Sequence, residues 1–233
     1  MQTAANAPLR GISSMATRQL LAELVEQFQQ RCALRIEFES VGGVDAAKRV
    51  QGGEPFDVVV LASDALDKLE AAGRIEAGSK VDLVRSGVAV AVRAGAAQPD
   101  LSSEAAVREA VLAARTLSYS TGPSGVALAR LFERWGIAER IAPRIVQAPP
   151  GVPVGSLVAS GEAELGFQQL SELIHLDGIA VVGPLPPQIQ ITTVFSGGVC
   201  TATGRAEAVR DALAFMRSPA CDDAKRRQGM EPA

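Results

Sequence analysis

The stretch "LRIEFESVGGVDAAKRVQGGEPFDVVVLAS", residues 34–63, contains two strand patterns on either side of a short helical one. Leu34, Ile36 and Phe38 alternate with charged residues, which is the period of a half-buried strand. Residues 57–63 hold a continuous apolar run, typical of a strand buried on both faces of a parallel sheet. The strand–helix–strand order predicts parallel pairing with right-handed crossovers.

The same alternation extends in both directions along the chain. Helix spacing of apolar residues precedes the stretch in residues 15–31, and a second helix follows it and ends near Gly73. A second series of strands and helices begins at a helix over 103–114, for which Ser102 or Ser103 is the expected N-cap. The remaining expected elements are strands at 115–120, 144–148 and 164–169, helices at 126–136, 154–162, 170–176, 205–217 and 219–228, and long β-rich stretches at 81–95 and 189–202.

Two strand–helix series that flank two long extended stretches predict an α/β protein of two Rossmann-like lobes. We expect mixed sheets and two hinge strands between the lobes. The first lobe is expected to take residues 1–83 and 193–233, and the second residues 84–192, with a ligand cleft between them.

Composition excludes several classes of function. The formal net charge of −3 and the scattered basic residues give no electrostatic footprint for nucleic acid. No apolar run approaches the roughly 20 residues that a membrane helix needs, so we expect no membrane insertion. The segment "MQTAANAPLRG" lacks the features of a signal peptide, which predicts a cytoplasmic protein as written, or a periplasmic one if a leader was removed.

The sequence offers few residues for metal or nucleophilic chemistry. Cys32, Cys200 and Cys221 have no short spacing, and His175 is the only histidine. We therefore expect no metal site, no cofactor and no Ser-His-Asp triad. GxxxxGK, GxGxxG and GxSxG motifs are absent as well.

Four places combine a strand end with a helix start rich in glycine or hydroxyl groups. They are Ser13-Ser14, Gly42-Gly43, Ala62-Ser63 and the turn "STGPSG" at 120–125. A helix N-terminus carries unpaired N–H groups and a partial positive charge, so small polar residues there allow an anion to approach. Ordinary N-capping is the alternative reading at each place.

The chain resembles the molybdate-binding component of bacterial ABC importers, a type II periplasmic binding protein, and a branch similar to aconitate isomerase. The resemblance lies in the quoted stretch and its flanks, from "ISSMATRQLLAELV" to "VLASDALDKLEAAGRI", and continues in "GPSGVALARLFERWGI", "VASGEAELGFQQLSEL" and "FMRSPACDDAKRRQGMEP". It implies two α/β lobes that close on a small anion. It is distributed over nearly the whole chain, so it bears more on fold than on ligand.

Only some of the ligand-binding residues of the family have counterparts in this chain. This chain has Val44 where the molybdate binders have serine, and Gln168-Gln169 where they have tyrosine. An amide both donates and accepts hydrogen bonds, which suits a carboxylate better than a bare oxyanion. Together with the helix starts, the expected ligand-binding residues are Ser13, Ser14, Gly43, Val44, Ser63, Ser120, Thr121, Ser124, Gly125, Gln168 and Gln169.

Two functions remain open at the level of sequence, and a third is disfavoured. The first is a monomeric binding protein for an oxyanion or small polycarboxylate, with an ABC permease as partner if the chain is exported. The second is an isomerase that shifts an allylic proton in an unsaturated di- or tricarboxylate, with Asp45 or Glu172 as the nearest acidic candidates. The third, a regulatory sensing module, would need a DNA-binding domain, and the sequence contains none.

Overall fold

The computed structural model describes residues 7–149 and 151–233. The chain forms two compact units. Unit 1 comprises the residues up to Arg85 together with Val194–Ala233, and unit 2 comprises Ser86–Thr193. Each unit is an α/β structure with its own sheet and its own hydrophobic core.

The sheet of unit 1 has the strand order β2-β1-β3-β8. Strand β1 is parallel to β2 and to β3, and β3 is antiparallel to β8. All five residues of β3 are buried, which confirms the strand predicted from the apolar run in 57–63. The strands are β1 (Leu9–Ser14), β2 (Ile36–Val41), β3 (Val58–Ala62) and β8 (Thr192–Val199).

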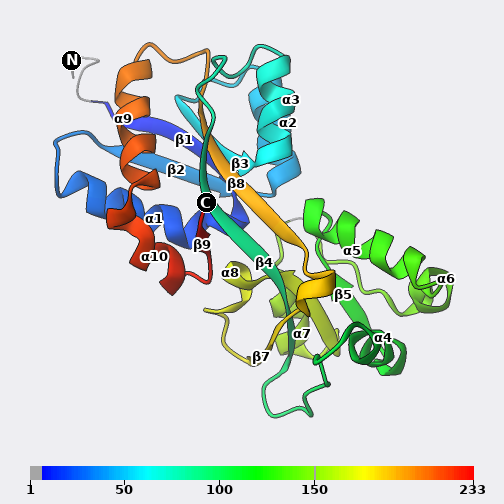
Figure 1. The fold of residues 1–233 in the computed structure, drawn as a ribbon. Helices are drawn as coiled ribbons and strands as arrows, with labels where there is room; N and C mark the ends of the chain where they lie inside the picture. The colour runs from blue at the N-terminus through cyan, green and yellow to red at the C-terminus, as the bar shows by residue number, and fades with distance from the viewer. Residues whose placement is uncertain (1–6, 150) are drawn as a thin grey trace. The chain divides into compact units, whose positions relative to one another are not determined.

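Helices cover both faces of this sheet (Figure 1). On one face, α1 (Arg18–Gln29), α9 (Ala206–Arg217) and α10 (Asp222–Arg227) enclose the larger core cluster. On the other face, α2 (Gly43–Gln51) and α3 (Ser63–Ala71) enclose the second cluster. The short helix η2 (Met15–Thr17) joins β1 to α1.

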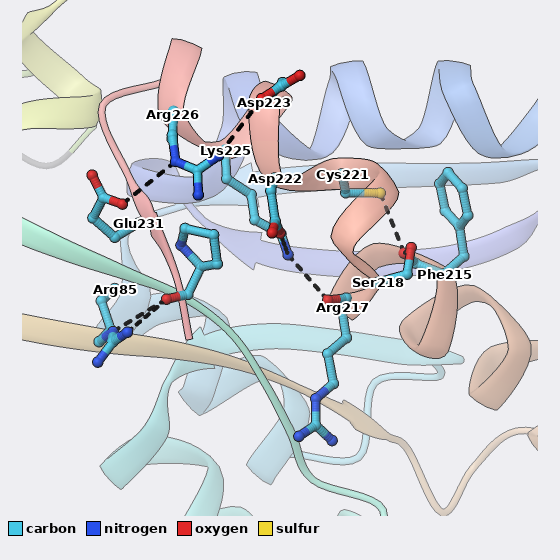
Figure 2. Close-up of polar contacts among 11 residues, drawn as sticks. Arg85, Phe215, Arg217, Ser218, Cys221, Asp222, Asp223, Lys225, Arg226 and Glu231 are labelled. Atoms are coloured by element: carbon cyan, nitrogen blue, oxygen red, sulfur yellow. Dashed lines mark hydrogen bonds and ion pairs between the residues drawn. The ribbon is translucent and has the colours of Figure 1, made fainter.

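The C-terminal segment is attached to the long strand β4 (Val81–Arg93). Strand β9 (Glu231–Pro232) pairs with the first half of β4, and the Arg85 guanidinium donates hydrogen bonds of 2.9 and 3.2 Å to the Pro232 carbonyl oxygen (Figure 2). These contacts hold the end of the chain on unit 1.

Unit 2 is built around the second half of β4. Strand β4 is antiparallel to β6 (Leu165–Gln169) and to β7 (Ile179–Pro184), and β6 is parallel to β5 (Leu117–Tyr119). Phe132 lies at the centre of the core, with its ring 5.8 Å from Tyr119 and 6.2 Å from Phe167 between centroids. The helices are α4 (Glu104–Ala113), α5 (Pro123–Arg134), α6 (Ala138–Ile141), α7 (Val154–Ser160) and α8 (Leu170–Leu173), and the 3-10 turns are η3 (Ala142–Arg144) and η4 (Pro187–Ile189).

One strand that the sequence predicts in unit 2 is absent from the structure. Residues 144–148 form no strand; Ile145 makes an isolated bridge to Leu117, and the Val146 N–H donates to the Leu117 carbonyl oxygen at 2.7 Å. Proline lies on both sides of this segment, at 143 and 149, and proline limits ladder pairing to a residue or two. The segment therefore runs along the edge of β5 without extending the sheet.

No helix in the described ranges is long and apolar enough to cross a bilayer. No group of three or more His, Cys, Asp or Glu in these ranges has an arrangement that could hold a metal ion.

Candidate functional site

In unit 1, the hydroxyl of Ser14 lies where β1 ends and two helical segments begin. Ser14 is the N-cap of η2, and its Oγ accepts a hydrogen bond of 3.3 Å from the Ala16 N–H. A Cβ built on Gly43, the first residue of α2, would lie 3.6 Å from the same Oγ. The glycine lets the start of α2 approach the serine closely, so one hydroxyl and the N–H groups of a nine-residue helix share a small region.

Ser13 has a different environment from Ser14. Its side chain is fully buried, and its Oγ lies 2.8 Å from Ser40 Oγ on the neighbouring strand. The two serines are paired in the register of β1 and β2. The Ser13 hydroxyl is therefore hydrogen-bonded to the neighbouring strand. Of Ser13 and Ser14, it is Ser14 that lies beside the starts of η2 and α2.

The other expected residues of unit 1 lie at the same edge of the sheet. Strands β1, β2 and β3 are parallel, so Ser14, Gly43 and Ser63 all follow carboxyl ends of strands. Ser63 is half-buried, and Val44 is 49% exposed. Asp45, in the first turn of α2, is exposed to solvent.

In unit 2, the turn at 120–125 folds back onto the start of α5. Ser120 Oγ lies 3.1 Å from Ser124 Oγ, and Thr121 is exposed. A Cβ on Gly125 would lie only 1.6 Å from the Ser120 carbonyl oxygen, so this position excludes every side chain. Gly122 caps this twelve-residue helix, whose first turn holds no acidic residue. The arrangement leaves a positively polarised helix end beside two hydroxyls.

Gln169, the last residue of β6, has one unpartnered amide end. Its side chain is 3% exposed, and Nε2 donates to Thr193 Oγ1 at 2.9 Å. Oε1 is buried and has no partner among the described residues. A buried amide without a partner is uncommon, because the missing hydrogen bond costs roughly 1–3 kcal/mol. Ser118 in β5 and Ser171 in α8 likewise hold buried hydroxyls without partners in the described ranges.

Gln168 points to the other side of β6 and joins two further elements. Its Oε1 accepts a hydrogen bond of 3.3 Å from the Gly155 N–H in the first turn of α7. Its Nε2 donates to Glu172 Oε2 in α8. Glu172 is half-buried, and burial raises its pKa to about 7 although the hydrogen bond from Gln168 acts to lower it. The pair thus combines an anchored amide with a carboxyl group that titrates near neutral pH.

Gln168, Gln169 and Glu172 can be picked out as candidates from the sequence, but their arrangement cannot be predicted from it. The pairing of Gln168 with Glu172 spans a strand–helix junction, where spacing alone does not fix side-chain direction. The roles of Ser40, Gly155 and Thr193 were not predicted, because their contacts reach across 13 to 27 residues of chain. The only available signal was the strand period, which places neighbouring glutamines on opposite faces.

Comparison with known proteins gives a consistent family. Residues 9–231 match the family model of the bacterial extracellular solute-binding protein. The chain is 36% identical over 227 residues to aconitate isomerase from a Pseudomonas species, a match that covers 95% of this chain and 86% of that protein. It is 27% identical over 161 residues to the molybdate-binding protein ModA of Azotobacter vinelandii, covering 68% of this chain and 62% of that protein.

Solved structures show the same fold. The periplasmic molybdate-binding protein of Azotobacter vinelandii superposes with a TM-score of 0.79 at 21% identity and covers 95% of this chain and 98% of that one. The sulfate-binding protein SubI of Mycobacterium tuberculosis superposes with a TM-score of 0.79 at 13% identity, covering 97% of this chain and 87% of that one. The predicted fold class, a type II periplasmic binding protein, is confirmed.

Proposed function

Because the chain belongs to the family of bacterial extracellular solute-binding proteins, we propose that it binds a small organic polycarboxylate. Helix starts and neutral polar side chains supply the binding groups, so the charge of the ligand is balanced by N–H dipoles and not by a fixed cation. In unit 1 these groups are Ser14 and the start of α2, and in unit 2 they are Ser120, Ser124 and Gln169.

The observation that carries this proposal is the unpartnered end of the buried Gln169 amide. A tetrahedral oxyanion such as molybdate can only accept hydrogen bonds, whereas an organic acid that carries a hydroxyl or a protonated carboxyl group can also donate one. As placed, Gln169 Oε1 would accept a hydrogen bond from such a donor; because the Thr193 hydroxyl can donate as well as accept, the amide can also turn and present Nε2 to a carboxylate. Val44, exposed at the second position of α2, offers an apolar contact for a carbon skeleton and no hydroxyl for an oxyanion.

A panel of ligands tests the proposal through the melting temperature of the chain. The panel holds molybdate, tungstate, sulfate, citrate, tricarballylate, and cis- and trans-aconitate. A ligand at 100 times its Kd stabilises the folded state by about 2.7 kcal/mol. We expect at least one polycarboxylate to raise the melting temperature by several degrees and molybdate to leave it unchanged. A shift with molybdate and tungstate alone would contradict the proposal.

A second candidate function is isomerisation of an unsaturated tricarboxylate. The Gln168–Glu172 pair favours it, because a carboxyl group with a pKa of about 7 can both accept and return a proton at neutral pH. The identity of 36% with an aconitate isomerase over nearly the whole chain supports the same candidate. Proton NMR of trans-aconitate incubated with the chain in D2O tests it, with cis-aconitate and carbon-bound deuterium as the expected products. An unchanged spectrum from a chain that binds trans-aconitate would reject it.

The proposed binding role also implies a partner and a place. In a transport setting the partner is an ABC permease, and the compartment is the periplasm or the cell exterior, where the solute-binding family acts.

A further inference from the structure

A groove in unit 1 lies between α1 and strand β2. Its volume is about 540 Å³, within the roughly 300–1,000 Å³ that is typical of small-molecule sites in proteins. Strand β2 is the last strand on its side of the sheet among the described residues, so no further strand closes the groove there. The side chains that line it include Arg18, Leu21 and Val25 of α1 and Ile36, Phe38 and Ser40 of β2.

The groove has two different ends. Gln29, the last residue of α1, accepts at its Oε1 a hydrogen bond of 3.1 Å from the Ile36 N–H at the start of β2. The end of the helix therefore lies beside the start of the strand, and the two elements run antiparallel. It follows that Ile36 lies at one end of the groove and that Arg18 and Ser40 lie toward the other.

The middle of the groove is apolar and its floor is fixed. The Phe38 ring lies over Gly11 of β1, where a Cβ would come within 2.4 Å of the ring atoms. The glycine lets the ring approach the backbone of the neighbouring strand. Leu21 and Val25 line the groove from the helix side. An apolar ligand body would be removed from water among these side chains, which is favourable.

Arg18 gives the groove a positive charge that no described residue balances. Its side chain is exposed, and its guanidinium forms no ion pair, hydrogen bond or ring contact within the described residues. The acidic residues of β2 occupy the alternate positions, and Glu39 pairs with Arg49 of α2 on the other face of the sheet. A free guanidinium complements a carboxylate, to which it can donate two parallel N–H hydrogen bonds.

The groove and Ser14 lie on opposite faces of the sheet. Ile36 belongs to the core cluster enclosed by α1, whereas Ile12, two positions before Ser14, belongs to the cluster enclosed by α2 and α3. Because side chains alternate along a strand, Ser40 points to the α1 face with Ile36, and Ser14 points to the α2 face with Ile12. A ligand in the groove would therefore use none of the groups proposed to bind the polycarboxylate.

Beyond the proposed function, we propose that this groove is a second binding site of the chain and that it takes a small amphipathic monocarboxylate. The carboxylate binds the Arg18 guanidinium at the polar end of the groove, and the hydrocarbon body lies along Leu21 and Phe38. A polycarboxylate does not suit this site, because the groove supplies one cation, and a further carboxylate among its apolar walls would lose water without gaining a partner.

Calorimetric titration with octanoate tests the proposal, with acetate and octylamine as comparison ligands. We expect saturable heat with octanoate at one ligand per chain, both alone and with an excess of trans-aconitate present. Acetate lacks the apolar body, and octylamine carries the opposite charge. Neither should bind in the concentration range over which octanoate saturates the chain.

Two variants assign the heat to the groove. Arg18→Met removes the cation and should weaken octanoate binding at least about tenfold, since a charge-assisted hydrogen bond is lost. Arg35→Met is the matched control, because Arg35 is an exposed arginine beside β2 that does not line the groove, and it should leave the affinity within about twofold. Ala22→Phe, at an exposed position of α1 that lines the groove, should fill it and abolish octanoate binding in a chain that still unfolds cooperatively.

Contrary results are distinct for this site and for the proposed function. The groove site is overturned if octanoate gives no saturable heat, or if Arg18→Met or Ala22→Phe binds it as tightly as the unaltered chain does. Displacement of octanoate by trans-aconitate would place octanoate among the polycarboxylate-binding groups and would overturn the groove site as well. A chain that binds octanoate but no polycarboxylate would reject the proposed function and leave the groove site standing.

Discussion

Ser14 has two roles that can be separated at the scale of one residue. It caps η2, and its hydroxyl lies against the start of α2. Loss of an N-cap serine costs about 1 kcal/mol wherever it occurs. Ser103 is a matched control, because it caps α4 with a hydrogen bond of 3.1 Å from the Ala106 N–H to its Oγ.

We predict that Ser14→Ala and Ser103→Ala destabilise the chain by similar amounts, about 1 kcal/mol each. Only Ser14→Ala should weaken polycarboxylate binding, because a ligand hydrogen bond is lost as well. Urea unfolding measures the first effect and calorimetry the second. Equal affinities in the two variants would show that Ser14 is a cap and nothing more.

Glu172 should make the chain less stable as the pH rises, which is opposite to the effect of most carboxyl groups in folded proteins. Its pKa is about 7 in the folded chain, against a reference value of 4.5. The folded state therefore binds more protons than the unfolded state between these values, so the free energy of unfolding falls as pH rises through this window. Above it, the charged carboxylate destabilises the folded state by up to about 3 kcal/mol.

We predict that Glu172→Gln removes this penalty. Relative to the unaltered chain, the variant should gain up to about 3 kcal/mol in urea unfolding between about pH 5 and pH 8. A gain in stability that is larger at pH 8 than at pH 5 would identify Glu172 as the titrating group. A stability difference that is the same at both pH values would show that Glu172 is not the titrating group.

Residue types were easier to predict from sequence than their environments. The sequence left Ser13 and Ser14 as equal candidates, and the structure separates them: Ser13 is bonded to Ser40, and Ser14 lies at the helix starts. The raised pKa of Glu172 could not be predicted, because it arises from uncharged elements that the fold brings around it.

At the scale of elements, the end of α9 is held by an almost fully buried lysine. Lys225, in α10, is 1% exposed, and its Nζ donates to the Arg217 carbonyl oxygen at 3.2 Å and to Asp222 Oδ1 at 3.1 Å (Figure 2). Arg217 is the last residue of α9, so the ammonium group satisfies a carbonyl that the helix itself leaves free.

We predict that Lys225→Met destabilises the chain by about 2 kcal/mol, because the carbonyl loses its donor and Asp222 its partner. Arg226→Met, the neighbouring change, removes only surface ion pairs to Asp223 and Glu231 and should cost less than about 0.5 kcal/mol. Urea unfolding of both variants gives the comparison. Equal costs would contradict the capping role of Lys225.

The elements most accurately predicted are those with a clear apolar pattern or a clear cap. Strand β3 follows the apolar run, and α4 begins after Ser103 as its N-cap, as expected. The strand expected at 144–148 is absent, because flanking prolines limit pairing to single contacts. Strands β7 and β9 were not predicted, since each depends on pairing with the distant strand β4.

At the scale of the whole molecule, the order of elements together with the family resemblance predicted the fold class. Alternating strands and helices on either side of two long extended stretches predicted two α/β lobes, and the resemblance of the chain to a known family implied a type II periplasmic binding protein, a fold that the solved structures confirm. The ligand could not be predicted in the same way, because proteins with this fold include molybdate-, thiamin- and sulfate-binding members. We expect the specificity of this chain to depend on a few side chains at the helix starts.

The most direct test of the account is a calorimetric titration of the chain with trans-aconitate and, separately, with molybdate at neutral pH. The account predicts saturable heat with trans-aconitate at one ligand per chain, a weaker affinity in Ser14→Ala and in Gln169→Ala, and no heat with molybdate. Saturable binding of molybdate with no response to trans-aconitate or any other polycarboxylate would contradict it.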